Sequence, residues 1–263
     1  MLELNKIYNI DCLEGMKDIT DKSIDMILCD LPYGTTACKW DTIIPFRPLW
    51  EHYERIVKNN GVIALTGSEP FSSLLRTSNL NLYKYDWIWK KAKPTGFSHS
   101  KNMPLKDYEN IMIFSKGSIN HAHISKNRMI YNPQGVFECE RKIKRNKKGF
   151  EGTMERKSQV NEYIGKLSGF PKMIIEFSNV LFNTIHPTQK PIDLFEYLIK
   201  TYSNEGELVL DNCIGSGTTA IACINTNRNY IGFEWCPDEP HDKYFVLANK
   251  RIEEHKQNIN INT

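Results

Sequence analysis

The stretch DNCIGSGTT, residues 211–219, is the part of the sequence that most narrows the possible folds, and it directly follows the apolar run Leu208–Leu210. Such a run predicts a buried strand that ends in the carboxylate of Asp211. Gly215 and Gly217 allow a sharp turn and a close approach of the backbone to a ligand. The first N–H groups of a helix that begins directly after them face the same space. The stretch therefore predicts a strand, a turn and a helix that bind a nucleotide-like cofactor.

A second apolar strand, Tyr230–Phe233, ends in Glu234, seventeen residues beyond Gly217. A doubly wound α/β sheet places at this point the acid that binds ribose hydroxyls. The Gly-x-Gly pair alone is also compatible with an ordinary tight turn. A nicotinamide dehydrogenase is disfavoured because the third glycine of its dinucleotide loop is absent and no group of acids for hydride transfer is visible.

The chain has 263 residues, of which 40% are hydrophobic and 25% charged. This length and composition are typical of one large α/β domain, alone or with a small insert. No stretch approaches the roughly 18 consecutive apolar residues of a membrane span. Residues 1–9 show no signal-peptide pattern. We therefore expect no membrane segment. Seven cysteines without a Cys-x-x-Cys pair predict reduced thiols in a cytoplasmic protein that has no metal site.

Positive charge gathers in the middle of the chain. The net charge is +3, but residues 116–172 contain 13 Lys and Arg against 5 Asp and Glu, which is +8. A basic segment within an acidic scaffold indicates a polyanionic partner, although a solvated loop has the same composition. We expect a domain formed by residues 1–115 and 173–263, and an insert formed by residues 116–172.

The hydrophobic periodicity predicts the remaining elements. Apolar groups at helical spacing predict a helix over residues 45–58 that stops at Asn59-Asn60-Gly61, whereas periodicity is lost over residues 116–172 and predicts irregular structure there. Strands are predicted over 62–65, 85–89 and 111–114, and helices over 70–75, from 191 through 199, and over 242–255.

A further strand, residues 23–29, ends at Asp30-Leu31-Pro32-Tyr33. Pro32 prevents the strand from continuing, and strand ends of this kind line the ligand crevice of an open α/β sheet. Asp30–Tyr33 and Asp211–Thr219 together resemble the amino-methyltransferases of DNA. That family usually has Asp-Pro-Pro-Tyr as its catalytic tetrapeptide and Asp-Pro-Phe-x-Gly-Ser-Gly-Thr-Thr as its cofactor turn. Further matches along the chain are Asp11–Glu14, Trp89–Lys90, Tyr108–Asn110 and His186–Pro191.

The catalytic motif precedes the cofactor turn, which is the order of the beta group of this family. The resemblance therefore implies an α/β, Rossmann-like S-adenosylmethionine-dependent methyltransferase fold that is circularly permuted and carries a small basic target-recognition insert. It implies a site-specific enzyme that methylates the N6 amino group of adenine in double-stranded DNA. The alternatives are cytosine N4 as the target and a catalytically decayed DNA-binding module. The sequence leaves open the recognised site, a homodimer, a cognate restriction endonuclease, and an orphan or phage role.

The resemblance also implies roles for individual residues. In the catalytic motif, the Asp30 carboxylate and the Leu31 carbonyl would accept hydrogen bonds from the target amino group, next to Pro32, and Tyr33 would stack on the extruded base. The residues implied for the cofactor are Asp211, Gly215 and Gly217 at its methionine part, Glu234 at the ribose, Asp11 near the adenine, and Thr188 and Lys190 at its carboxylate.

The sequence departs from the family pattern in two places. Leu31 replaces a proline and Asn212-Cys213 replaces Pro-Phe, so we expect weaker cofactor affinity with an intact site. The expected phosphate-contacting run lies within the insert, where phosphate contacts position a protein on DNA without reading bases. Its cations are Arg141, Lys142, Lys144, Arg145, Lys147 and Lys148.

Overall fold

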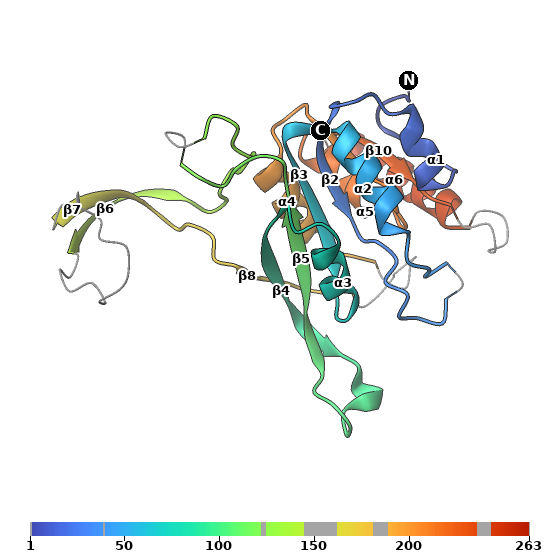
Figure 1. Ribbon diagram of the computed structural model, residues 1–263, viewed down its shortest axis with the longest axis horizontal. Coiled ribbons are helices and arrows are strands. Elements are labelled where there is room, and N and C mark those ends of the chain that lie inside the picture. The colour runs from blue at the N-terminus through green and yellow to red at the C-terminus, as the bar shows by residue number, and fades with distance from the viewer. Residues whose placement is uncertain are drawn as a thin grey trace. The chain divides into compact units, whose positions relative to one another are not determined.

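The computed structural model describes residues 2–38, 40–121, 125–144, 162–180, 189–235 and 243–262 (Figure 1). The chain divides into one unit formed by Met1–Asn132 and Met173–Thr263 and a second formed by Pro133–Lys172. No helix in the described part of the chain is both long and apolar enough to cross a membrane.

An eight-stranded mixed sheet organises the first unit, in the order β1-β10-β9-β2-β3-β5-β4-β8. The strands are β1 (Lys6–Tyr8), β2 (Ile24–Cys29), β3 (Val57–Gly67), β4 (Tyr83–Thr95), β5 (Lys106–Phe114), β8 (Ile174–Phe177), β9 (Leu208–Asp211) and β10 (Asn229–Phe233). The helices are α1 (Cys12–Gly15), α2 (Phe46–Ile56), α3 (Phe71–Ser78), α4 (Ile192–Tyr202), α5 (Thr218–Asn225) and α6 (Lys243–Asn262), with short 3-10 turns η1 (Met16–Asp18) and η2 (Phe97–His99).

Strand direction brings the two predicted motifs to one edge of the sheet. β1, β10, β9, β2 and β3 are parallel neighbours, and Ile27 of β2 lies opposite Leu210 of β9. The carboxyl ends of these strands therefore meet at the same edge, where open α/β sheets bind ligands. β5 runs antiparallel to β3 and to β4, so the sheet is parallel on one side and mixed on the other.

Two apolar layers cover the sheet, one on each face. Side chains alternate along a strand, so Met26 and Leu28 pack with α4, α5 and α6, whereas Ile27 and Cys29 pack with α1, α2 and α3. β2 is buried along its whole length, which explains why it reads as a nearly continuous apolar run. Asp25 is the polar residue in this apolar run. It is buried, and its carboxylate accepts hydrogen bonds from the Lys58 ammonium at 2.6 Å and from the Leu208 N–H at 3.0 Å.

The expected helices and strands of the first unit occur, with one correction. The helix predicted over residues 45–58 ends at Ile56, and Asn59-Asn60-Gly61, expected as its stop, lies inside β3. Gly61 is required there because a Cβ atom would lie 2.7 Å from the Asp25 carbonyl oxygen of the adjacent strand. Local turn propensity was therefore outweighed by pairing with β2.

The segment 116–172 is more regular than its sequence indicates. Residues 116–132 belong to the first unit, because Met129 is buried in its core and the Asn132 N–H donates to the Thr201 carbonyl at 2.7 Å. The second unit contains an antiparallel pair, β6 (Phe137–Lys144) and β7 (Glu162–Ser168), so the expectation of irregular structure was wrong there.

The cationic run falls partly on this hairpin. Arg141 and Lys142 are exposed on β6, and Lys144 is the last residue of that strand. Arg145, Lys147 and Lys148 lie outside the described residues, so their expected phosphate contacts remain a prediction.

Candidate active site

A cavity of about 600 Å³ opens at the carboxyl ends of the parallel strands of the first unit. Its lining includes both predicted motifs: Asp30, Leu31, Pro32 and Tyr33 from the end of β2, and Asp211, Gly215 and Glu234 from the ends of β9 and β10, together with Asp11 and Lys190. Thr188 lies outside the described residues, so its expected contact with the cofactor remains a prediction. Folding thus places the two stretches around one space.

Asp211 organises the turn that follows β9. Its Oδ1 accepts the Cys213 N–H at 3.1 Å, and its Oδ2 accepts the hydroxyl of Thr219 in the first turn of α5. Burial raises the pKa of Asp211 to about 6, although these hydrogen bonds oppose the rise. The carboxylate therefore fixes the loop and also presents a poorly solvated negative charge to the cavity.

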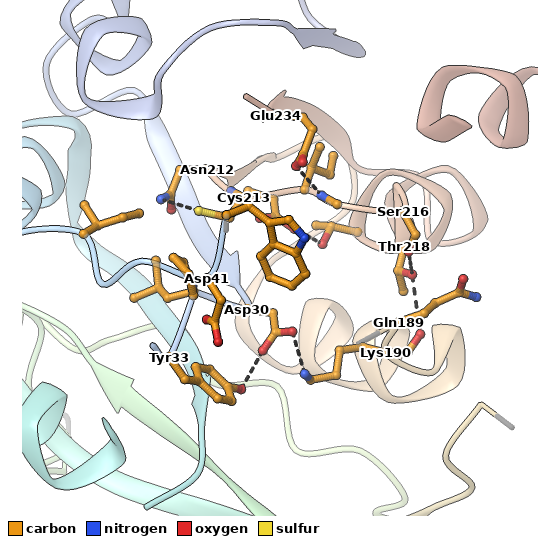
Figure 2. Close-up of a pocket in the computed structure, with 18 of the residues that line it drawn as sticks. Asp30, Tyr33, Asp41, Gln189, Lys190, Asn212, Cys213, Ser216, Thr218 and Glu234 are labelled. Carbon is orange, nitrogen blue, oxygen red and sulfur yellow. Dashed lines mark hydrogen bonds and ion pairs between the residues drawn. The ribbon is translucent and has the colours of Figure 1, made fainter. Parts of the chain in front are cut away.

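Gly215 connects this loop to Glu234. Gly215 has a φ of 52°, which glycine adopts without strain, and its N–H donates to Glu234 Oε2 at 2.7 Å (Figure 2). Burial raises the pKa of Glu234 to about 7, and the nearby charge of Asp211 adds to the effect. Two acids with raised pKa values thus face one side of the cavity.

Gly217 serves a different purpose from the expected one. It has a φ of 77° at the start of α5, but it does not line the cavity. A Cβ atom on Gly217 would lie 3.2 Å from Ile252 Cδ1 and 3.4 Å from Ala248 Cβ, both on α6. The missing side chain makes room for α6 rather than for a ligand, which corrects the reason expected from the sequence.

Asp30 is held by three donors directly after β2. Its Oδ1 accepts the Tyr33 hydroxyl at 2.6 Å and the Thr66 hydroxyl, and its Oδ2 accepts the Lys190 ammonium at 2.5 Å (Figure 2). A carboxylate offers about four lone-pair sites, so three donors leave room for one more. The Asp30 side chain is 19% exposed and faces the cavity, where an amino group could be that fourth donor.

Charges of alternating sign extend from Asp30 away from the cofactor turn. Lys190 also lies 3.4 Å from Glu109 Oε2, and the other oxygen of Glu109 lies 2.6 Å from the Lys91 ammonium. Burial lowers the pKa of Lys190, but the carboxylates of Asp30 and Glu109 outweigh it and raise the pKa above its ordinary value. Burial raises the pKa of Glu109, and the two ammonium groups outweigh it and lower the pKa. Lys190 and Glu109 therefore both favour their charged forms.

Tyr33 is fixed at both ends of its side chain. Its ring stacks on Phe71 with centroids 5.0 Å apart and an interplanar angle of 22°, and its hydroxyl reaches Asp30. Burial and the neighbouring carboxylates raise the pKa of the hydroxyl well above its ordinary value, so Tyr33 acts as a hydrogen-bond donor. Leu31, at the position of the usual proline, is buried in the core at 3% exposure.

Two aspartates that line the cavity have structural partners. Asp11 caps α1, because its Oδ1 accepts the Leu13 N–H at 2.8 Å. Asp41 holds the loop after Tyr33, because its carboxylate accepts the N–H groups of Gly34, Thr35 and Thr36 at 2.7 to 2.9 Å. The expected contact of Asp11 with an adenine ring would therefore use a side chain already positioned by the helix.

Sequence reasoning missed several residues of this site. Glu109 lies in the tripeptide that matched the family, but its charge alone did not single it out. Thr66, Lys91 and Asp41 showed no local signal, because each depends on strand pairing or loop closure.

Comparison with known proteins identifies the family. A family model described as DNA methylase matches residues 24–239. The type II methyltransferase M1.MboII of Moraxella bovis is 26% identical over 96% of this chain and 100% of its own length. The DNA adenine methyltransferase YhdJ of Escherichia coli (strain K12) is 26% identical over 88% of this chain and 79% of its own length.

Solved structures show the same fold. The M1.HpyAVI–SAM complex has a TM-score of 0.60 at 24% identity and covers 94% of this chain and 98% of its own. The cytosine-N4-specific PvuII DNA methyltransferase has a TM-score of 0.62 at 13% identity, and the match covers 97% of this chain and 92% of the PvuII enzyme. Since the family match spans most of the sequence and includes both motifs, the chain belongs to the N6/N4 DNA methylase family.

Proposed function

We propose that this protein transfers a methyl group from S-adenosylmethionine to the N6 amino group of adenine in duplex DNA. The observation that carries the proposal is the position of Asp30. Its carboxylate faces the same cavity as the turn formed by Asp211, Gly215 and Glu234, and it is oriented by Tyr33, Thr66 and Lys190.

The cavity suits S-adenosylmethionine in size and charge. About 600 Å³ lies within the range of pockets that bind drug-sized ligands. This ligand carries a sulfonium and an ammonium group, and Asp211 and Glu234 are acids with raised pKa values that line the cavity. Positive charge and ribose hydroxyls would stabilise both carboxylates, so the residues present fit the ligand. When bound, it supplies an electrophilic methyl group.

Asp30 and Leu31 would activate the target amino group. The nitrogen lone pair of an exocyclic amino group is conjugated with the ring, which makes it a poor nucleophile. Hydrogen bonds from its N–H groups to the Asp30 carboxylate and the Leu31 carbonyl would draw the nitrogen out of conjugation. The donor, held by Asp211, Gly215 and Glu234, would supply its methyl group to this nitrogen, and the nitrogen would release one N–H proton to solvent. The Lys190 ammonium, 2.5 Å from Asp30 Oδ2, would hold the Asp30 carboxylate in place.

Tyr33 would position the extruded base. A base must leave the helix stack to reach Asp30, at a cost of a few kcal/mol. Phe71 supports one face of the Tyr33 ring, so a base would stack on the opposite face. The main contribution of the protein is orientation, because a correctly held nucleophile needs no covalent enzyme intermediate.

Adenine is favoured over cytosine by two observations. The first catalytic position is Asp30, which within the resemblance is associated with adenine, and a relative with similarity over most of the chain is named as an adenine methyltransferase. The cytosine-N4-specific structural neighbour, at 13% identity, shares the fold alone. Nuclease digestion and mass spectrometry of DNA methylated by the protein test the choice. We expect N6-methyladenine, and N4-methylcytosine as the sole product would assign the alternative substrate.

We further propose that residues 116–172 include the target-recognition region. Support comes from the net charge of +8 and from the exposed Arg141 and Lys142 on β6. Phosphate contacts by such residues release counterions and hold the duplex without selecting its sequence.

A further inference from the structure

The hairpin formed by β4 and β5 is longer than the sheet requires. Trp87 and Trp89 in the inner part of β4 are buried, as are residues 109–114 of β5. From residue 92 onward β4 is exposed, and so are residues 106–108 of β5. Figure 1 shows this ribbon extending away from the rest of the sheet. The outer part contributes little apolar burial, so fold stability alone does not explain it.

The outer ribbon is basic and carries an exposed aromatic ring at its tip. Residues 90–107 contain five lysines and one aspartate, a net charge of +4. Lys90 and Lys91 form ion pairs with Glu176 and Glu109. Within the described residues, no ion pair involves the other three lysines, Lys93, Lys101 and Lys106.

Apolar side chains stand beside these charges. Phe97 is 80% exposed and Met103 is 48% exposed. Gly96, with a φ of 84°, turns the chain just before Phe97, and no heavy atom lies within 4 Å of its Cβ position. The tip therefore offers an aromatic ring that no other part of the described protein covers.

The base of the ribbon borders the active site. Trp89, Lys91 and Thr95 line the cavity that contains Asp30. The ribbon is anchored there, because the Lys93 N–H donates to Asn179 Oδ1 and the Asn179 amide donates to the Lys93 carbonyl, each at 3.2 Å. At about 3.3 Å per residue, β4 spans roughly 20 Å between Trp89 and Thr95. A duplex that delivers a base to the cavity would meet this ribbon.

We propose that the tip of this hairpin, residues 93–106, is a DNA-contacting element distinct from the basic insert. Lys93, Lys101 and Lys106 contact phosphates next to the extruded base, and Phe97 stacks on or wedges between neighbouring bases. A two-stranded ribbon fits the major groove of B-DNA. A second copy of this chain is a poorer partner, because two tips of the same charge repel. The inference rests on the proposed function, since it names a surface for the same DNA substrate.

Two sets of variants test the contact. In the first, Lys93, Lys101 and Lys106 are replaced by glutamine, and duplex affinity is measured across a salt series. Loss of three phosphate contacts should lower the slope of log affinity against log salt by about 2.7. In the second, Phe97→Ala should weaken duplex binding about 5- to 150-fold, and Phe97→Trp should restore it, because stacking requires an aromatic face. The affinity for S-adenosylmethionine should stay unchanged in all three.

A matched control replaces three lysines on other surfaces, Lys17, Lys250 and Lys256, by glutamine and should leave the salt slope unchanged. An unchanged slope and affinity in both hairpin variants, while the wild-type protein still methylates duplex DNA, would overturn the hairpin role and leave the proposed function intact. A loss of self-association in sedimentation, with DNA affinity retained, would also overturn it by assigning the tip to a protein partner. A wild-type protein that does not methylate duplex DNA would contradict the proposed function itself.

Discussion

Replacement of Glu234 by glutamine should have opposite effects on stability and on cofactor binding. Burial raises the pKa of Glu234 from 4.5 to about 7 in the folded chain without ligand, so the ionised carboxylate destabilises the fold. Glutamine has nearly the same shape and can still accept the Gly215 N–H through its amide oxygen. It removes the charge but not the hydrogen bond.

The magnitude follows from the size of the pKa change. A rise from 4.5 to about 7 corresponds to about 3 kcal/mol at 1.36 kcal/mol per pH unit. At pH 8 the group is ionised in both states, so the whole penalty applies. At pH 5 the folded carboxyl group is protonated, and the penalty falls below about 1 kcal/mol. Glu234→Gln should therefore raise the Tm of the 263-residue chain by about 5 °C at pH 8 and by much less at pH 5.

Calorimetry measures both the stability of the variant and its affinity for S-adenosylmethionine. Unfolding scans of ligand-free protein at pH 5 and pH 8 give the stability difference, with the exposed Glu253→Gln as a control that should barely move the Tm. Titration with S-adenosylmethionine at pH 8 should show about 10- to 100-fold weaker binding, since charge-assisted hydrogen bonds to the ribose are lost. An unchanged or lower Tm for Glu234→Gln at pH 8 would refute the buried-charge argument.

Two further substitutions probe the turn and the charge network. Gly217→Ala should lower the free energy of unfolding by about 1–3 kcal/mol, because residue 217 has a positive φ and the added Cβ would lie close to Ile252. The folded variant should still bind S-adenosylmethionine. Loss of binding with full stability would contradict this expectation. Lys190→Met leaves the carboxylates of Asp30 and Glu109 without their shared cation. It should cost about 3–5 kcal/mol of stability and slow single-turnover methyl transfer. Lys91→Met is its control, since Lys91 contacts Glu109 but not Asp30, and equal rate losses in the two variants would argue against a special role for Lys190.

Both functional stretches could be predicted because their signals are local. An apolar run followed by an acid and two glycines predicts a strand and a sharp turn, and Pro32 marks the end of β2 in the sequence itself. The positive φ values of Gly215 and Gly217 agree with a sharp turn. That both stretches face one cavity also follows from parallel strands, whose carboxyl ends meet at one edge.

The partners of Asp30 could not be predicted, because they come from elements far apart in the sequence. Thr66 reaches Asp30 only through the pairing of β3 with β2, and Lys190 reaches it from the residues before α4. The family resemblance assigned Lys190 to the cofactor carboxylate, whereas in the structure its ammonium lies against Asp30 and Glu109. The reason for a glycine at position 217 could not be predicted either, because the space that a side chain there would need is occupied by α6, far along the sequence.

The central claim is that Asp30 acts on the target base while the turn at Asp211 and Gly215 binds the methyl donor. Transfer of labelled methyl groups from S-adenosylmethionine to duplex DNA by the wild-type protein and by Asp30→Ala tests it most directly, with calorimetric titration of the donor on both proteins. We predict methylation by the wild type alone and nearly equal donor affinity for the two. Equal turnover by the two proteins, or loss of donor binding in Asp30→Ala, would contradict this division of the site.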